Sequence, residues 1–385
     1  MKLFIIPSWY PTKINPASGN FFKERAVFLK KSGIDVVVIA PILHSFRNIL
    51  KYKQMNSANL NEEVLTTIIN EQMNVFPKNE KLTFYSYQKR AIKLFDKAIR
   101  EYGKPDMVMF NSSIWAGAAL CNKLNDEKIP FIVSEHLKEF LMPKGFSKFN
   151  QKLIQKTYDS CLKIIPTSRA LKKSIIKRFK VDENKISLVP NPVDEGLFML
   201  RPPTNNNKTI SITTVALLRK EKNIDLIIKA FHEILKLGIN ANLNIVGDGP
   251  LKSRIINQIN QLNNSHKIKL WGYLQPDQIV KVLHQTDIFI MGSSIETFGV
   301  SLIEAQACGI PAVATKCGGP NDIILKDSGI LVKPNSEFEL SKGLQAIIKN
   351  INFYDSKNIR RKTIERFGKN VYCQQIKKAI LLVKN

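Results

Sequence analysis

Two glutamates, Glu296 and Glu304, stand eight positions apart in Gly292-Ser-Ser-Ile-Glu-Thr-Phe-Gly-Val-Ser-Leu-Ile-Glu-Ala-Gln-Ala-Cys-Gly-Ile-Pro311. This pattern predicts a strand end, a glycine-containing turn, and a helix that stops at Gly309 ahead of Pro311. Glu296 is then in the loop before the helix and Glu304 is within it, so both carboxylates can face one cleft. A carboxylate suits vicinal hydroxyls, so one glutamate can hold a ribose and the other a hexose.

The start of this predicted helix is a candidate anion site. The first N–H groups of a helix have no partner within it and lie at the positive end of the helix dipole, which suits a diphosphate. The backbone groups concerned belong to Thr297, Phe298, Gly299, Val300 and Ser301.

The stretch from Gly292 to Pro311 closely resembles the E-x7-E motif of glycosyltransferase family 4. Other segments resemble further parts of that family. Trp9-Tyr-Pro11 with Ser18-Gly-Asn20 resembles its N-terminal loop, and Val189 to Asp194 with Phe198 resembles its hinge-side segment. Ile245 to Pro250 resembles the turn of its second domain, and Leu270 to Tyr273 resembles its base-binding strand end. The resemblance covers most of the chain. It implies a retaining glycosyltransferase of the bacterial polysaccharide type with the GT-B fold.

The resemblance also implies roles for single residues. Gly19 lies where small residues let the backbone approach the donor phosphate or the acceptor, and Lys222 occupies the family's lysine position. Leu217 stands where the family has arginine, so Arg219 is the candidate to serve the diphosphate instead. Cations are needed there because the leaving nucleoside diphosphate gains negative charge.

The catalytic candidates are His136 and Glu296. The resemblance places His136 near the donor sugar, assigns Glu296 to the sugar hydroxyls and assigns Glu304 to the donor ribose. The alternative for His136 is a buried histidine with a satisfied hydrogen bond and no role in the reaction.

Neither a metal nor another cofactor is expected. Asp-x-Asp does not occur, and His, Cys and carboxylates show no metal-ligand spacing, so Lys222 and the helix start would replace a divalent ion at the phosphates. The five Cys lack any CxxC pairing and favour a reducing compartment. Gly247-Asp-Gly-Pro250 lacks the third glycine of a dinucleotide fingerprint and favours a turn, and Cys317-Gly-Gly-Pro320 suits either a turn or a close approach to the cleft.

The chain alternates short apolar runs with helix-like segments, as βαβ units do. The fold class is therefore α/β: two Rossmann-like, doubly wound parallel sheets facing across a cleft. We expect an acceptor domain at 1–195, completed by a C-terminal helix at 368–385, and a donor domain at 208–367, with a proline- and asparagine-rich linker at 192–208. Apolar runs predict strands in the second half at 210–216, 243–246, 268–270, 288–291, 311–314 and 329–332. Predicted strands in the first half include 186–189, and 41–90 is read as inserted helices and loops.

At 385 residues, with 44% hydrophobic and 23% charged residues, the chain fits two globular domains. Its apolar runs are too short to cross a bilayer, and Pro7 interrupts the first of them, which therefore predicts a buried strand and no signal peptide. The protein is expected to be cytoplasmic.

The net charge of +26 implies an anionic partner: nucleic acid, acidic phospholipid or phosphorylated substrate. An AT-rich genome that favours Lys codons is the alternative. Lys144, Lys148, Lys152 and Lys156 recur every four residues through a predicted helix at 147–158, and 171–180 is similarly basic. Both segments predict peripheral docking on the inner face of the plasma membrane; the alternative is lysines that only keep a helix face in water.

The predicted function is transfer of a hexose-type sugar from a UDP- or GDP-sugar to a glycan or lipid-linked acceptor in surface polysaccharide synthesis. Donor base, sugar, acceptor and linkage stay open. Two alternatives remain: a nucleotide-sugar epimerase of the same fold, and a nucleic-acid-binding protein, which only the charge favours.

Overall fold

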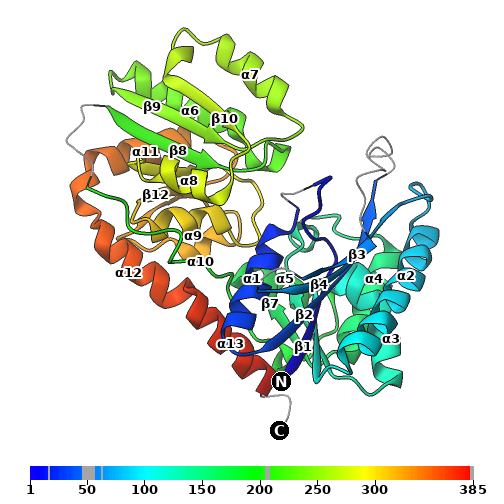
Figure 1. The fold of residues 1–385 in the computed structure, drawn as a ribbon. Helices are drawn as coiled ribbons and strands as arrows, with labels where there is room; N and C mark the ends of the chain where they lie inside the picture. The colour runs from blue at the N-terminus through cyan, green and yellow to red at the C-terminus, as the bar shows by residue number, and fades with distance from the viewer. Residues whose placement is uncertain (16–17, 46–56, 62–63, 204–208, 382–385) are drawn as a thin grey trace. The chain divides into compact units, whose positions relative to one another are not determined.

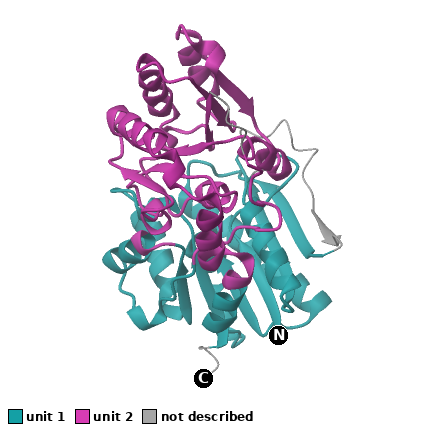
Figure 2. Cartoon of the chain, turned by 90° about the vertical axis from the view of Figure 1, so that its left-hand side faces the viewer, with its two compact units in different colours: residues 1–167, 171–189, 373–385 teal, residues 168–170, 190–372 magenta. Residues whose placement is uncertain are grey.

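The computed structural model describes residues 1–15, 18–45, 57–61, 64–203 and 209–381. The chain divides into two compact units (Figures 1 and 2). Unit 1 comprises Met1–Thr167, Leu171–Val189 and Cys373–Asn385, and unit 2 comprises Ser168–Ala170 and Pro190–Tyr372. Unit 1 ends at Val189 and resumes at Cys373, close to the limits that the sequence predicted at 195 and 368. Unit 2 begins at Pro190, well before the predicted start at 208, so the predicted linker is part of unit 2.

In its described part, unit 1 holds a seven-stranded sheet in the order β3-β4-β2-β1-β5-β6-β7. Its strands are β1 (Lys2–Pro7), β2 (Asp35–His44), β3 (Ser57–Asn61), β4 (Thr66–Met73), β5 (Met107–Asn111), β6 (Phe131–Glu135) and β7 (Lys163–Pro166). Every pair is parallel except β3 with β4. The prediction for 41–90 was wrong in part, because the segment contributes strands β3 and β4 as well as the start of a helix at Glu80. The predicted strand at 186–189 was wrong, since it forms only an isolated bridge from Ile186 to Ile164.

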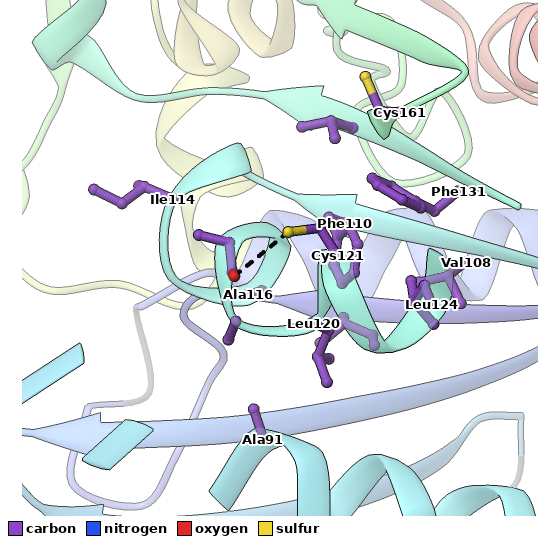
Figure 3. Close-up of a cluster of buried hydrophobic side chains, with 14 of the residues drawn as sticks. Ala91, Val108, Phe110, Ile114, Ala116, Leu120, Cys121, Leu124, Phe131 and Cys161 are labelled. Carbon is purple, nitrogen blue, oxygen red and sulfur yellow. Dashed lines mark hydrogen bonds between the residues drawn. The ribbon is translucent and has the colours of Figure 1, made fainter. Parts of the chain in front are cut away.

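Unit 1 holds helices and short helical turns, several of which pack on a core of buried apolar side chains that Figure 3 shows in part. They are α1 (Asn20–Lys31), α2 (Glu80–Tyr102), the single π turn η2 (Ser113–Gly117), α3 (Ala118–Asp126), η3 (Lys138–Phe140), α4 (Lys148–Ser160), α5 (Arg169–Arg178), which begins in unit 2, and η4 (Glu183–Lys185). Cys121 and Cys161 are part of this core, and Cys121 Sγ donates to the Ala118 carbonyl at 3.6 Å (Figure 3). All five cysteines are free thiols.

The described part of unit 2 holds a six-stranded parallel sheet in the order β10-β9-β8-β11-β12-β13. Its strands are β8 (Ile210–Val215), β9 (Ala241–Val246), β10 (Ile268–Gly272), β11 (Ile288–Met291), β12 (Ala312–Thr315) and β13 (Gly329–Val332). All six coincide with predicted apolar runs, because strands buried on both faces read as continuous hydrophobic segments.

The helices of unit 2 cover both sides of this sheet. They are η5 (Lys220–Lys222), α6 (Ile224–Lys236), α7 (Lys252–Asn260), η6 (Ser265–Lys267), α8 (Pro276–Leu283), α9 (Val300–Ala307), α10 (Pro320–Ile323), α11 (Glu337–Lys349), η7 (Ile351–Phe353) and α12 (Ser356–Phe367). Helix α6 shows why a helix forms here, since its isoleucines and Phe231 recur on one buried face.

The first part of the predicted linker is packed against the core of unit 2. Val193 and Phe198 are buried in the core beside α9, and Val193 N–H donates to the Phe367 carbonyl at 2.8 Å. The last helix, α13 (Lys369–Leu381), belongs to unit 1 from Cys373 onward, and Lys377 Nζ donates to the Ser32 carbonyl at 2.5 Å.

Candidate active site

In unit 2, the loops that follow β8, β11 and β12 meet at the carboxyl edge of the sheet, where ligands bind in open α/β sheets. Ser294 N–H donates to the Glu221 carbonyl at 2.8 Å, and Thr315 Oγ1 donates to the Ser293 carbonyl at 2.5 Å. Glu296 is held by its own backbone, which accepts from Gly319 N–H at 2.8 Å and donates to the Cys317 carbonyl at 3.1 Å. The backbone therefore fixes where Glu296 lies.

Lys222 and Glu296, predicted separately as donor-binding residues, form an ion pair. Lys222 Nζ donates to Glu296 Oε2, and the two side chains are 22% and 15% exposed. Burial by itself lowers the pKa of Lys222, but the Glu296 carboxylate raises it by more, so the pKa lies above its ordinary value. A charged lysine is therefore fixed at the point where β8 and β11 end.

Helix α9 begins at Val300, and its N-cap is Gly299, whose φ of 114° is in the left-handed region that favours glycine. Because Gly299 carries no side chain, no capping hydrogen bond covers the helix start. Thr297 is half-buried there, whereas Phe298 is buried and its ring packs on Phe367 at 5.6 Å. Only the backbone of Phe298 is therefore left for an anion.

Glu304 is half-buried within α9, on the element that follows the Glu296 loop. The structure thus places both glutamates in one unit, on consecutive elements. It pairs Glu296 with Lys222, while the role of Glu304 at a ribose stays a prediction.

Arg219 is exposed in the loop after β8, beside the exposed Leu217 and the buried Leu218. Among the described residues, none forms a hydrogen bond or ion pair with the Arg219 guanidinium. This side chain is therefore available to an anionic ligand.

Gly247-Asp-Gly-Pro250 is a turn packed against that loop. A Cβ at Gly247 would lie 1.9 Å from the Ala216 carbonyl oxygen, and Leu218 N–H donates to the Asp248 carbonyl at 2.9 Å. Close backbone packing explains these glycines without a dinucleotide.

His136 follows the carboxyl end of β6 in unit 1. Arg25 from α1 places its Nη1 3.2 Å from His136 Nε2, and Ser134 Oγ is 2.9 Å from the same nitrogen. A guanidinium only donates, so the ring accepts and is neutral. Burial, with the Arg25 charge as a second cause, holds the pKa of His136 well below its usual value. Phe21 and Phe22 of α1 complete this cluster, with ring centroids 5.8 and 5.0 Å from the imidazole.

If His136 lies beside the donor sugar, as the family resemblance implies, its neutral imidazole acts in the transition state, and we expect His136→Ala to lower kcat by about 10²-fold. The free energy of unfolding should fall by only about 1–2 kcal/mol. Steady-state kinetics and urea unfolding measure both losses. His284→Ala, which removes a histidine bonded to the Met199 carbonyl in unit 2, is the control. Equal fractional losses in folding and turnover for His136→Ala would leave it a purely structural residue.

Gly19 is the N-cap of α1, with φ 71°. A Cβ there would lie 2.6 Å from the Trp9 carbonyl oxygen. The glycine is thus required by packing within its own loop, and its approach to a donor or acceptor stays a prediction.

Sequence reasoning assigned no role to Arg25 or Glu135, although Glu135 is adjacent to His136. Glu135 is fully buried, and its Oε1 accepts from Ser113 N–H at 2.9 Å and from Tyr158 Oη at 2.8 Å. Its Oε2 and the Ser112 and Ser113 hydroxyls have no hydrogen-bond partner among described atoms. Ser112 (φ 99°) and Trp115 (φ 60°, ψ −91°) are strained, as residues near functional sites often are.

Burial raises the pKa of Glu135 to about 7. Between its ordinary value of 4.5 and 7, the folded chain therefore binds more protons at this group than the unfolded chain does, and stability falls as pH rises. Over that window the loss amounts to roughly 3 kcal/mol. Glu135→Gln keeps the shape of the side chain but cannot ionise. Its thermal midpoint should therefore exceed that of the wild type at pH 8, where the buried carboxyl is charged, and not at pH 5, where it is neutral. Midpoints that differ equally at both pH values would contradict a titrating Glu135.

Two family models together cover most of the chain. Residues 19–197 match "Glycosyltransferase Family 4", and residues 199–370 match "Glycosyl transferases group 1". An uncharacterized glycosyltransferase of Methanocaldococcus jannaschii is 26% identical over 260 residues, covering 63% of this chain and 66% of that protein. A human phosphatidylinositol N-acetylglucosaminyltransferase subunit is 28% identical over 216 residues, covering 52% and 44%. The chain thus matches less than two thirds of the length of either relative.

The fold is that of GT-B glycosyltransferases. The Anabaena protein Alr3699/HepE, solved in complex with UDP-glucose, superimposes with a TM-score of 0.75 over 99% of both chains at 18% identity. The two sheets therefore have the GT-B fold. By its matching family models, the chain belongs to the family 4 type of glycosyltransferases.

Within the described ranges, His, Cys, Asp and Glu side chains do not gather in any group of three able to hold a metal ion. Among the same residues, no helix has the length and apolar character needed to cross a membrane.

Proposed function

We propose that the chain transfers a hexose-type sugar from a UDP- or GDP-sugar to a glycan or lipid-linked acceptor, in the cytoplasm and in surface polysaccharide synthesis. The observation that carries the proposal is the Lys222–Glu296 pair at the carboxyl edge of β8 and β11, next to the uncapped start of α9. A fixed cation and free N–H groups suit a diphosphate, and a carboxylate suits sugar hydroxyls.

Each residue then has a role in the reaction. Lys222, with Arg219 from the same loop, neutralises the charge that grows on the leaving diphosphate, so that no metal is required. Glu296 holds the donor sugar, Glu304 the ribose, and His136 lies at the reacting centre. Attack from the same face as the leaving group, without a general base, retains the anomeric configuration.

The comparisons support this choice of ligands. Alr3699/HepE was solved with UDP-glucose, and the human relative is named as part of a phosphatidylinositol N-acetylglucosaminyltransferase. A nucleotide-sugar donor and a lipid-linked acceptor are therefore the first ligands to test, with UDP-glucose and UDP-N-acetylglucosamine as donors.

Thermal-shift measurements with UDP, GDP and their sugars test the proposal. A ligand at 100 times its dissociation constant stabilises the folded state by about 2.7 kcal/mol, and one nucleotide should give that shift in the presence of EDTA. If no nucleotide stabilises the protein, the donor assignment fails. Activity lost with EDTA and restored by manganese would overturn metal independence, and an epimerised sugar released without acceptor would identify an epimerase.

A further inference from the structure

Four large apolar side chains of unit 1 are exposed together where β4 ends and α2 begins. Val75 and Phe76 follow β4 and are 57% and 41% exposed, and Leu82 and Tyr85 on the first turns of α2 are 47% and 56% exposed. Leu82 and Tyr85 are three positions apart, so both lie on one face of the helix. We call these four residues the β4–α2 surface.

Hydrogen bonds hold this surface in a fixed shape. Asn79 caps α2 by accepting from Leu82 N–H at 3.0 Å. The Phe76 carbonyl accepts from Asn79 N–H at 3.0 Å and from Thr83 Oγ1 at 2.6 Å, and Phe76 N–H donates to Asn74 at 2.9 Å. The exposed Phe76 ring is therefore presented by an ordered loop, and its exposure is not the result of a frayed segment.

Lysines surround the surface. Residues 74–93 contain Lys78, Lys81, Lys89 and Lys93, all exposed, and a single acidic residue, Glu80. Lys81, Tyr85, Lys89 and Lys93 follow one another every four residues, so cations and the exposed ring share one stripe of α2.

Helix α4 and the residues before it add further exposed lysines beside this surface. Ser147, its N-cap, donates to Glu80 Oε2 at 2.7 Å, and Asn150 donates to Glu80 Oε1, so α4 begins beside α2, as the labels in Figure 1 also show. Lys144, Lys148, Lys152 and Lys156 are all exposed, while Phe149 and Ile154 pack on the core. Residues 141–156 contain no acidic residue.

The surface is at the functional edge of unit 1. Strand β4 runs parallel to β2, and β2, β1, β5 and β6 are parallel to one another, so the loop after β4 is at the same edge of the sheet as His136. Exposed apolar rings within a field of lysines are the combination that binds the interface of anionic bilayers.

We propose that the β4–α2 surface docks unit 1 on an anionic lipid bilayer, with its apolar side chains in the headgroup region and the lysines of α2 and α4 against the acidic lipids. The lipid-linked acceptor then meets the carboxyl edge of the sheet from the membrane; this last step rests on the function proposed above, whereas the docking itself does not.

Vesicle sedimentation tests the docking with the full chain and without donor. We expect sedimentation with vesicles of phosphatidylcholine and phosphatidylglycerol at low salt, and little with phosphatidylcholine alone or at high salt. Phe76→Ser with Tyr85→Ser should weaken binding about tenfold, as should Lys81→Glu with Lys148→Glu. The two glutamates fall in first helical turns, where a negative charge stabilises a helix, so folding should survive the charge reversal.

Matched controls come from unit 2. Phe338→Ser removes a ring that is 60% exposed, and Lys326→Glu with Lys349→Glu reverses two exposed lysines. If these variants weaken binding as much as the β4–α2 variants, net charge alone binds the vesicles and the proposal fails. It also fails if no variant changes binding, if the wild type does not sediment, or if Phe76→Ser with Tyr85→Ser dissociates a dimer in the absence of lipid. Thermal shifts with nucleotides should be unchanged in every variant, so a failed docking test is distinguishable from a failed donor assignment.

Discussion

Replacing Lys222 by methionine is expected to lower kcat for sugar transfer by about 10²- to 10³-fold, the usual loss when one preorganised donor to a transition-state charge is removed. Methionine keeps an apolar stem of similar length and removes only the cation that the Glu296 carboxylate holds. Because Glu296 retains some exposure to water, the free energy of unfolding should fall by only about 1 kcal/mol. Steady-state kinetics and urea unfolding together measure the two effects.

Lys362→Met is the matched control, since it breaks the ion pair with Asp327 in the same unit but far along the chain from the candidate site. It should leave kcat unchanged. The double variant Lys222→Met with Glu296→Gln separates the two possible roles of the pair. If each residue contacts the donor, the double variant is slower than either single one; if the pair only maintains the fold, kcat in Lys222→Met remains within a few-fold of wild type and our assignment is wrong.

Replacing Gly319 by alanine is expected to lower kcat/KM by about 100-fold, although Gly319 would touch no substrate. A Cβ at Gly319 would lie 2.1 Å from both Cα and the carbonyl oxygen of Phe298, a backbone contact that no side-chain rotation relieves. The loop carrying Glu296 must therefore move, and a displacement of about 1 Å near reacting groups typically costs two orders of magnitude in rate. Kinetics with a thermal midpoint measure the effect.

Gly238→Ala is the control for a glycine substitution as such. Gly238 has φ of 77°, and no atom lies within 4 Å of the position that a Cβ would take, so alanine there should cost about 1 kcal/mol in folding and nothing in kcat/KM. Retained activity in Gly319→Ala would mean that the loop position does not matter to the reaction.

The first sheet shows why part of the fold could not be predicted. Strand β4 reads Thr-Thr-Ile-Ile-Asn-Glu-Gln-Met, too polar for a buried strand, yet Glu71 is buried. Its partner is His44 on the neighbouring strand β2, whose Nε2 is 2.7 Å from Glu71 Oε2. His44 and Glu71 are 27 residues apart in the chain, so the sequence around either one gives no sign of the other, yet their contact satisfies both buried polar side chains.

The run from Ile186 to Val189 gave the opposite error, because a strand was predicted where the structure has none. It is apolar and ends before a proline, as a strand would, but Leu188 is 37% exposed and the segment adds only single hydrogen bonds beside β7. In unit 2 every described strand was predicted, because each contains a short apolar run of the kind that a strand buried on both faces shows.

For the candidate site, residue types were predictable and partnerships were not. The motif from Gly292 to Pro311 predicted a loop glutamate and a helix start, and both are where expected. Lys222 and Glu296 are 74 residues apart in the chain, and their pairing depends on β8 and β11 being neighbours in the sheet. The Arg25–His136 contact likewise depends on how α1 packs near β6, which no local pattern reports.

The burial of the native thiols has a practical consequence for labelling. Burial raises the pKa of Cys161 and of Cys308 to about 12, so at neutral pH almost none of either is the reactive thiolate, and Cys121 is also sealed in the core. Maleimides and iodoacetamide should therefore modify these three positions only after the chain opens. Their alkylation rate therefore reports the rate of global unfolding. A cysteine added at an exposed position would react with a fluorophore much faster than these three.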